Sequence, residues 1–291
     1  MDLVNVLTTR FNAGASYSAI ASVRSVVSTM TSLWEGARLG EHPLVMRAMA
    51  AIRRNRPPKA AYEEFFEPTV VFQHMDGWGA LASITLEQLT RKLVTQAELQ
   101  CFARSADIAA IWTSKIVKDA QGRWTWRYFS PKHVRGRVLD WRSARPADFG
   151  PAKVLDDCAA EVRARDSLSA LVQEYLRRTE ERRAINTAAA LDAQPGLVLT
   201  TKVRGGVFRP LTAQRIAKLV KETIQGAGVG AEYSAHSCRG AGSTAALASQ
   251  DRATVRDRMS LGSESVFATH YAREQRAKRR RTATATATTT E

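Results

Sequence analysis

Apolar residues recur every three or four positions along much of this chain, which is the spacing of one face of an α-helix. Between residues 16 and 34 this spacing is carried by Ile20, Val23, Val27, Met30 and Leu33. Residues 85–100 repeat it, with Thr85 or Ser83 available to cap the first turn. The pattern predicts further helices over residues 43–52, 166–178, 211–227, 237–248 and 263–276, and a helix start within 101–108.

A two-residue alternation interrupts the helical pattern once. Trp124, Trp126 and Tyr128 fall on one face of a strand, and the turn residues 119–122 separate them from an apolar run at 116–118. This pattern predicts a β-hairpin whose aromatic residues form sheet core rather than stack on bases. With a possible short strand at 197–199, the fold class is mainly α with a small antiparallel β-sheet.

Pro57 and Pro58 divide the chain, because two successive prolines cannot continue a helix. We expect a helical domain over 1–55, a linker at 56–64, a second domain over 65–276 and a tail at 277–291. The first domain is short, as if N-terminal helices were missing. The tail begins with basic residues and ends in a Thr/Ala repeat, a composition that cannot build a core.

The charge balance narrows the choice of partners. The 291 residues include 43 Lys and Arg against 28 Asp and Glu, a formal charge of +15, and such a surface attracts polyanions. Nucleic acid is therefore the first candidate partner. Without a run of 18 uncharged apolar residues, we expect no membrane span and no signal peptide. Cys101, Cys158 and Cys238 are too scattered for a disulfide framework or a zinc site.

Common catalytic motifs are missing from the sequence. It has no phosphate-binding loop of the Gly-x-x-x-x-Gly-Lys type, no His-Glu-x-x-His and no Gly-x-Ser-x-Gly. The distinctive feature is an ordered series: Arg104 near a helix start, Lys132 after the hairpin, His236-x-x-Arg239 near another helix start, and Tyr271 in the last predicted helix. His-x-x-Arg alone is a weak signal, and His270 to Arg273 repeats it by chance.

Several stretches of the sequence, including those around these residues, carry a family resemblance. They are residues 16–20, 40–45, 56–58 with Tyr62, 102–107, 131–132, 175–179, 233–240 and 267–271. Over these stretches, which span nearly the whole chain, the sequence resembles the tyrosine recombinases, or phage integrases. The versions in eukaryotic mobile elements of the DIRS-like and Crypton kinds are the most similar. The resemblance implies a helical core-binding domain plus an α+β catalytic domain that clamp duplex DNA, assembly into dimers and tetramers on DNA, and catalysis without a metal or nucleotide cofactor.

The same resemblance implies a role for each residue. Tyr271 would attack a phosphodiester and form a 3′-phosphotyrosyl link, although only about one phenol in a thousand is ionised at pH 7. Arg104 and Arg239 would hold the phosphate oxygens, because planar guanidinium groups suit that geometry. His236 would move a proton near the nucleophile, and Lys132 would protonate the departing 5′-oxygen. Lys118, beside the hairpin turn, is an alternative to Lys132.

One departure from the family pattern bears on activity. Leu261 and Gly262 stand nine to ten residues before Tyr271, where the family usually has His or Trp, and neither side chain donates a hydrogen bond. A lost group of this kind typically costs about 10²- to 10⁴-fold in rate. The rival hypothesis is therefore a catalytically degenerate DNA-binding protein derived from such a recombinase. A relaxase of the type IB topoisomerase kind would use the same nucleophile.

Basic residues outside the ordered series are candidates for DNA contacts or for ordinary solvated charges. The candidates are Arg53, Arg54, Lys59, Arg209 and Arg215. In the tail, Lys278-Arg279-Arg280-Arg281 is typical of a nuclear-import signal or a phosphate-binding arm, and a solvated charge run is the alternative. We expect a mobile-element recombinase that acts in the nucleus.

Overall fold

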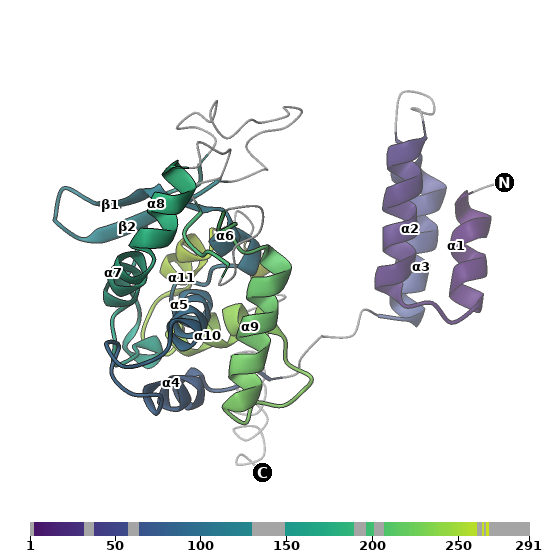
Figure 1. Ribbon diagram of the computed structural model, residues 1–291. Helices are drawn as coiled ribbons and strands as arrows, with labels where there is room; N and C mark the ends of the chain where they lie inside the picture. The colour runs from purple at the N-terminus through teal and green to yellow at the C-terminus, as the bar shows by residue number, and fades with distance from the viewer. Residues whose placement is uncertain are drawn as a thin grey trace, which may run out of the picture. The chain divides into compact units, whose positions relative to one another are not determined.

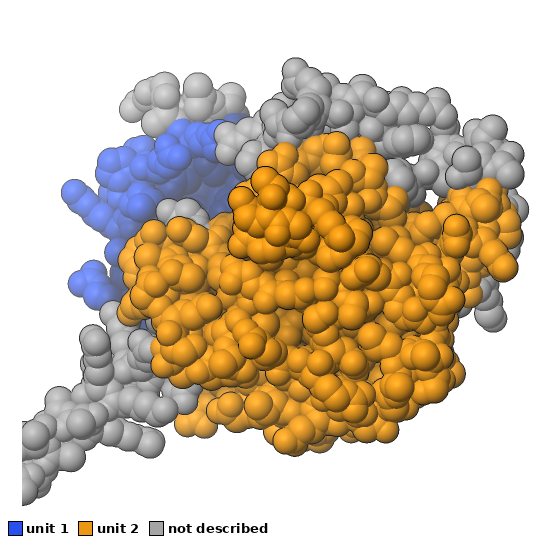
Figure 2. Space-filling model, turned by 90° about the vertical axis from the view of Figure 1, so that its left-hand side faces the viewer, with its two compact units in different colours: residues 1–62 blue, residues 63–291 orange. Residues whose placement is uncertain are grey.

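The computed structural model describes residues 3–31, 38–57, 64–129, 149–188, 196–200, 207–260, 264 and 266–267. The chain divides into two compact units, residues 1–62 and 63–291, which are coloured separately in Figure 2. This division lies within the 56–64 segment that contains the double proline. The roles assigned to the two units stay predictions.

The first unit is a set of packed helices (Figure 1). It contains α1 (Leu3–Asn12), α2 (Tyr17–Met30), the short 3₁₀ turn η1 (Leu39–Glu41) and α3 (Pro43–Asn55). Ser16 caps α2, since its Oγ accepts a hydrogen bond from the Ala19 amide at 3.2 Å. The core of the unit consists of Leu3, Leu7, Ile20, Val45, Met49 and Ile52.

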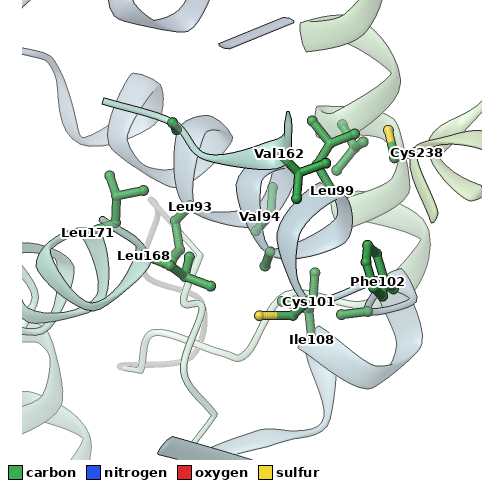
Figure 3. Close-up of a cluster of buried hydrophobic side chains, with 14 of the residues drawn as sticks. Leu93, Val94, Leu99, Cys101, Phe102, Ile108, Val162, Leu168, Leu171 and Cys238 are labelled. Carbon is green, nitrogen blue, oxygen red and sulfur yellow. The ribbon is translucent and has the colours of Figure 1, made fainter. Parts of the chain in front are cut away.

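Helix α5 (Leu86–Gln100) is the centre of the second unit. It packs against α7 (Leu168–Arg178), α9 (Ala213–Gly226) and α10 (Ala235–Ala246). A capping box between Thr85 and Gln88 begins α5, so Thr85 is the cap of the two residues, Thr85 and Ser83, that the sequence offered. Figure 3 shows side chains of α5 and α7 meeting in the core. The remaining helical elements are α4 (Pro68–Asp76), α6 (Ser105–Ala109), η5 (Ala160–Val162), α8 (Glu180–Ala188) and α11 (Arg252–Arg258).

The sheet has three antiparallel strands in the order β1 (Ile111–Lys118), β2 (Trp124–Tyr128) and β3 (Lys153–Val154). Trp126 lies opposite Ile116 on one side and Lys153 on the other, and it is 1% exposed. Trp124 and Tyr128 are partly buried against the same core, so the aromatic face of β2 is sheet core. The predicted fold class, mainly α with a small antiparallel sheet, is confirmed.

Some elements differ from the prediction. The helix expected from 101–108 begins at Ser105, because Phe102 has a φ of +52°, which a right-handed helix does not allow. The expected strand at 197–199 makes only isolated bridges, such as Leu199 with Pro210. Helices α1, α4, α8 and α11 were missed, and most of the 263–276 prediction lies outside the described residues.

Candidate functional site

The site is built around a cleft of about 570 Å³ where α6, α9 and α10 meet. Arg104 lies at the start of α6, and His236 and Arg239 lie on the first turns of α10. All three line this cleft, although more than 130 residues separate the first from the others. The structure thus brings together three of the five predicted catalytic residues. Their roles stay predictions.

The turn between α5 and α6 presents Arg104. The Arg104 amide donates to Asp107 Oδ2 at 2.9 Å, and its guanidinium Nη1 lies 3.9 Å from the same oxygen. One residue later, Ser105 Oγ donates to Glu98 Oε1 on α5 at 2.5 Å. The Arg104 side chain is 37% exposed, so it is anchored at its backbone while its charged end reaches the cleft.

Helix α10 brings Arg239 close to that turn. At Gly242 an added Cβ would lie 2.1 Å from the carbonyl oxygen of Leu99, so only glycine allows α10 to approach α5 this closely. Arg239 is 1% exposed. Its Nη1 donates to the Phe102 carbonyl and its Nη2 to the Met259 carbonyl. Arg239 is therefore one of the residues that line the cleft, and its side chain fastens two backbone segments to each other.

Helix α9 adds positive charge that the sequence analysis missed. Gln214, Lys218 and Lys221 line the cleft from one face of α9. Their spacing of four and three residues was visible in the predicted helix 211–227, and it could have indicated a common face. Lys218 and Lys221 are exposed, and they lie opposite His236, which is also exposed. The cleft is therefore cationic on two sides.

Two ionisable groups near the turn between α5 and α6, the buried Glu98 and the partly buried Lys153, have shifted pKa values. Burial raises the pKa of Glu98 to about 8, with Asp107 acting in the same direction, while the hydrogen bond from Ser105 and the charge of Arg239 oppose the shift. Burial also lowers the pKa of Lys153 to about 8. These shifts arise because a low-dielectric interior disfavours the charged form of each group.

The other predicted residues lie elsewhere. Lys132, Tyr271 and Lys59 are outside the described residues, as are Leu261 and Gly262. Lys118 is exposed at the end of β1, with its Nζ 5.4 Å from the centre of the Trp124 ring, and it is not among the residues that line the cleft.

The predicted DNA contacts fall into two groups. Arg209 and Arg215 line a second cleft of about 570 Å³ beside the N-terminal end of α9, with Glu87 and Thr90 of α5 on its other side. Arg53 and Arg54 are exposed on the last turn of α3, in the first unit. Arg209 and Arg215 are not among the residues that line the cleft holding Arg104.

In the part of the chain that the structure describes, no three His, Cys, Asp or Glu side chains are grouped as a metal site requires. No described helix is long and apolar enough to span a membrane. Cys101, Cys158 and Cys238 are buried free thiols.

No protein-family model matches this sequence, and no curated protein matches it. Several solved structures do match the fold of this chain. The XerH site-specific recombinase in a post-cleavage complex with its palindromic difH substrate superposes with a TM-score of 0.55 and 14% identity, covering 96% of this chain and 72% of that chain. The Tn1549 transposon integrase in complex with circular-intermediate DNA gives 0.51 and 10%, covering 93% and 80%.

The chain has the tyrosine recombinase fold. A lambda integrase tetramer bound to a Holliday junction gives a TM-score of 0.51 at 11% identity, covering 93% of this chain and 64% of the integrase. At such identities the comparison shows the fold alone. What this tyrosine recombinase fold does here depends on its own cleft residues.

Proposed function

We propose that this protein breaks and rejoins DNA strands through a 3′-phosphotyrosyl intermediate, as a site-specific recombinase or integrase. The observation that carries the proposal is the convergence of Arg104, His236 and Arg239 on one cleft of a tyrosine recombinase fold. The sequence had singled out these three residues for phosphate binding and proton transfer. The superposed XerH, Tn1549 and lambda proteins are complexes with DNA.

The proposed substrate is a DNA phosphodiester seated in the cleft. Arg104 and Arg239 hold its non-bridging oxygens and stabilise the charge that grows on them in the transition state. Lys218 and Lys221, across the cleft on α9, bind neighbouring phosphates of the same strand. Backbone contacts of this kind set the position of the DNA without reading its sequence.

In the covalent step, one bond to phosphorus forms as another breaks. The Tyr271 oxygen forms a bond to phosphorus as the bond from phosphorus to the 5′-oxygen breaks. The phenolic proton passes to His236, and the departing 5′-oxygen takes a proton from Lys132. A 5′-hydroxyl reverses the same step and joins a strand, because the bond energy is retained in the phosphotyrosyl link.

Further features complete the proposal. Each protomer cuts one strand, so strand exchange requires a dimer and then a tetramer on paired DNA sites. Residues at the linker and at the second cleft contact the flanking DNA, namely Arg53, Arg54, Lys59, Arg209 and Arg215. The protein serves a mobile element and enters the nucleus through its basic segment 278–281.

A catalytically degenerate DNA-binding protein is the second candidate. Two observations favour it: Arg239 is 1% exposed with donors directed at two backbone carbonyls, and Leu261 and Gly262 replace the usual His or Trp. Such a protein would keep the cationic cleft and its affinity for phosphates. It would not form a covalent link.

Covalent capture separates the two candidates. Purified protein is incubated in EDTA with a library of nicked duplexes, denatured, and examined for SDS-resistant protein–DNA adducts. Tyr271→Phe should abolish the adduct and leave DNA binding unchanged, because only the nucleophilic oxygen is removed. Tyr17→Phe on α2 is the matched control and should form adducts like the parent.

The outcomes assign the function. An adduct whose linked peptide contains Tyr271 supports the enzyme. DNA binding without an adduct, across a library that covers all sequences of the cleavage region, supports the degenerate binding protein. An adduct that persists in Tyr271→Phe would show that another residue is the nucleophile and would overturn the proposed mechanism.

A further inference from the structure

Three successive backbone carbonyls, at the last residue of α5 and the two residues after it, each accept a hydrogen bond from a different cation. The carbonyl of Gln100 accepts from Arg258 Nη2 at 3.1 Å, that of Cys101 from Lys153 Nζ at 3.4 Å, and that of Phe102 from Arg239 Nη1. The cations come from α11, β3 and α10, which are far apart in sequence. We call the carbonyls at 100–102 the carbonyl turn.

Two of these cations also hold a second backbone segment. Lys153 Nζ donates to the Arg258 carbonyl at 2.6 Å, and Arg239 Nη2 donates to the Met259 carbonyl. Each of the two side chains therefore bridges the carbonyl turn to the end of α11. The carbonyl turn leads within two residues to Arg104, and the end of α11 leads along the chain to Tyr271.

The position of the cations follows from the backbone. The last carbonyls of a helix have no partner within it, and the helix dipole places partial negative charge there. The positive φ of Phe102 turns the chain sharply away from the axis of α5, so helix hydrogen bonding does not continue. Side-chain cations then supply the missing donors.

Lys153 is costly at this position. Burial lowers its pKa to about 8, and the charges of Arg239 and Arg258 act in the same direction, while Cys101 and Asp107 oppose them. An apolar side chain on β3 would avoid this desolvation. A lysine here is better explained by the two carbonyls that it joins than by core stability.

We propose that Lys153 is a positioning residue: by joining the Cys101 and Arg258 carbonyls, it fixes the start of α6, with Arg104, against the end of α11, from which the chain runs to Tyr271. This inference rests on the proposed strand-cleavage function. Without Lys153, the two segments are still joined by Arg239 and by the hydrogen bond from Arg258 to the Gln100 carbonyl, but the Cys101 and Arg258 carbonyls lose the donor that they share. A misplacement of about 1 Å in a catalytic geometry can cost on the order of 10²-fold in rate.

The test compares Lys153→Met with Lys153→Arg, which keeps charge and donors. Lys115→Met is the matched control, because Lys115 lies on the same sheet but its Nζ rests 4.8 Å from the centre of the Phe149 ring, outside the bridge. Hydrogen–deuterium exchange of peptides covering 100–109 and 252–260 measures positioning. The rate of adduct formation at saturating DNA measures its consequence, and the Kd for DNA is measured in parallel.

We expect Lys153→Met to speed exchange in both peptides and to slow adduct formation by about 10- to 100-fold, with an unchanged Kd. Lys153→Arg should restore both readouts, and Lys115→Met should resemble the parent. If the methionine variant does not fold, Lys153→Gln, which keeps one amide donor on a neutral chain, takes its place.

Equal exchange and equal adduct rates for Lys153→Met and Lys115→Met would overturn the proposal. A slower adduct that Lys153→Arg fails to restore would also overturn it, because it would point to a role other than donation to the two carbonyls. The exchange readout needs no catalysis. If the parent forms no adduct while Lys153→Met still loosens both peptides, the strand-cleavage function has failed and the bridge has not.

Discussion

The cationic face of α9 leads to a quantitative prediction about DNA binding. Lys218 and Lys221 line the cleft, and both side chains are exposed. The double variant Lys218→Gln/Lys221→Gln removes two charges and keeps side chains that favour helices. If each lysine neutralises one phosphate, each contributes about −0.9 to the slope of log K against log salt.

The magnitude follows from that slope. Between 50 and 200 mM salt, one phosphate contact weakens binding by about 3.5-fold, which is four raised to the power 0.9, and two contacts by about 12-fold. The double variant should therefore lose about 1.8 from the slope, and it should differ most from the parent at low salt. Each single variant should lose about half of that.

Fluorescence anisotropy on one labelled duplex, at four or more salt concentrations, measures the slope. Arg177→Gln is the control: this residue is 67% exposed on α7, pairs with Glu174 at 2.8 Å, and lines neither large cleft. It should leave the slope unchanged. If the double variant keeps the parent slope, or if Arg177→Gln lowers it equally, the reasoning that places DNA phosphates against α9 is refuted.

Two further predictions concern the structure beneath the cleft. Because the pKa of Glu98 is raised from 4.5 to about 8, the folded protein keeps a proton that the unfolded chain releases, so the free energy of unfolding falls as pH rises between these values. Glu98→Gln should reduce this decline by up to about 1.4 kcal/mol per pH unit in urea unfolding, and parallel declines would contradict the shift. Gly242→Ala should lower the free energy of unfolding by about 1–3 kcal/mol or more, since its Cβ would lie 2.1 Å from the Leu99 carbonyl oxygen; an unchanged urea midpoint would contradict this close approach.

Periodicity predicted several helices and the hairpin but missed what depends on distant partners. Helix α5 and the β1–β2 hairpin follow from local spacing and turn residues. The burial of Lys92 does not: its Nζ lies 3.0 Å from Asp76 and 2.5 Å from Asp166, which are 16 and 74 residues away. A charged residue in a helical pattern indicates an exposed face unless its distant partners are known.

The same distinction applies to the candidate site, where some residues could be identified from the sequence and others could not. Arg104, His236 and Arg239 could be selected because their residue types suit phosphate transfer and their order resembles that of the tyrosine recombinases. Lys153 and Lys218 could not, since no local pattern shows that β3 reaches the carbonyl turn or that α9 faces α10 across a cleft. For Lys153, only the long-range hydrogen bonds distinguish it from other lysines.

The burial of Arg239 favours the binding protein, yet the fixed geometry of its side chain would also serve an enzyme. A guanidinium group presents its five N–H donors in one plane. Arg239 directs Nη1 and Nη2 at the Phe102 and Met259 carbonyls, and the residue is one of those that line the cleft. Backbone fixation then orients the fork in advance, which lowers the entropy lost when phosphate binds. Since preorganisation would serve a binding protein and an enzyme alike, the covalent link at Tyr271 decides between them.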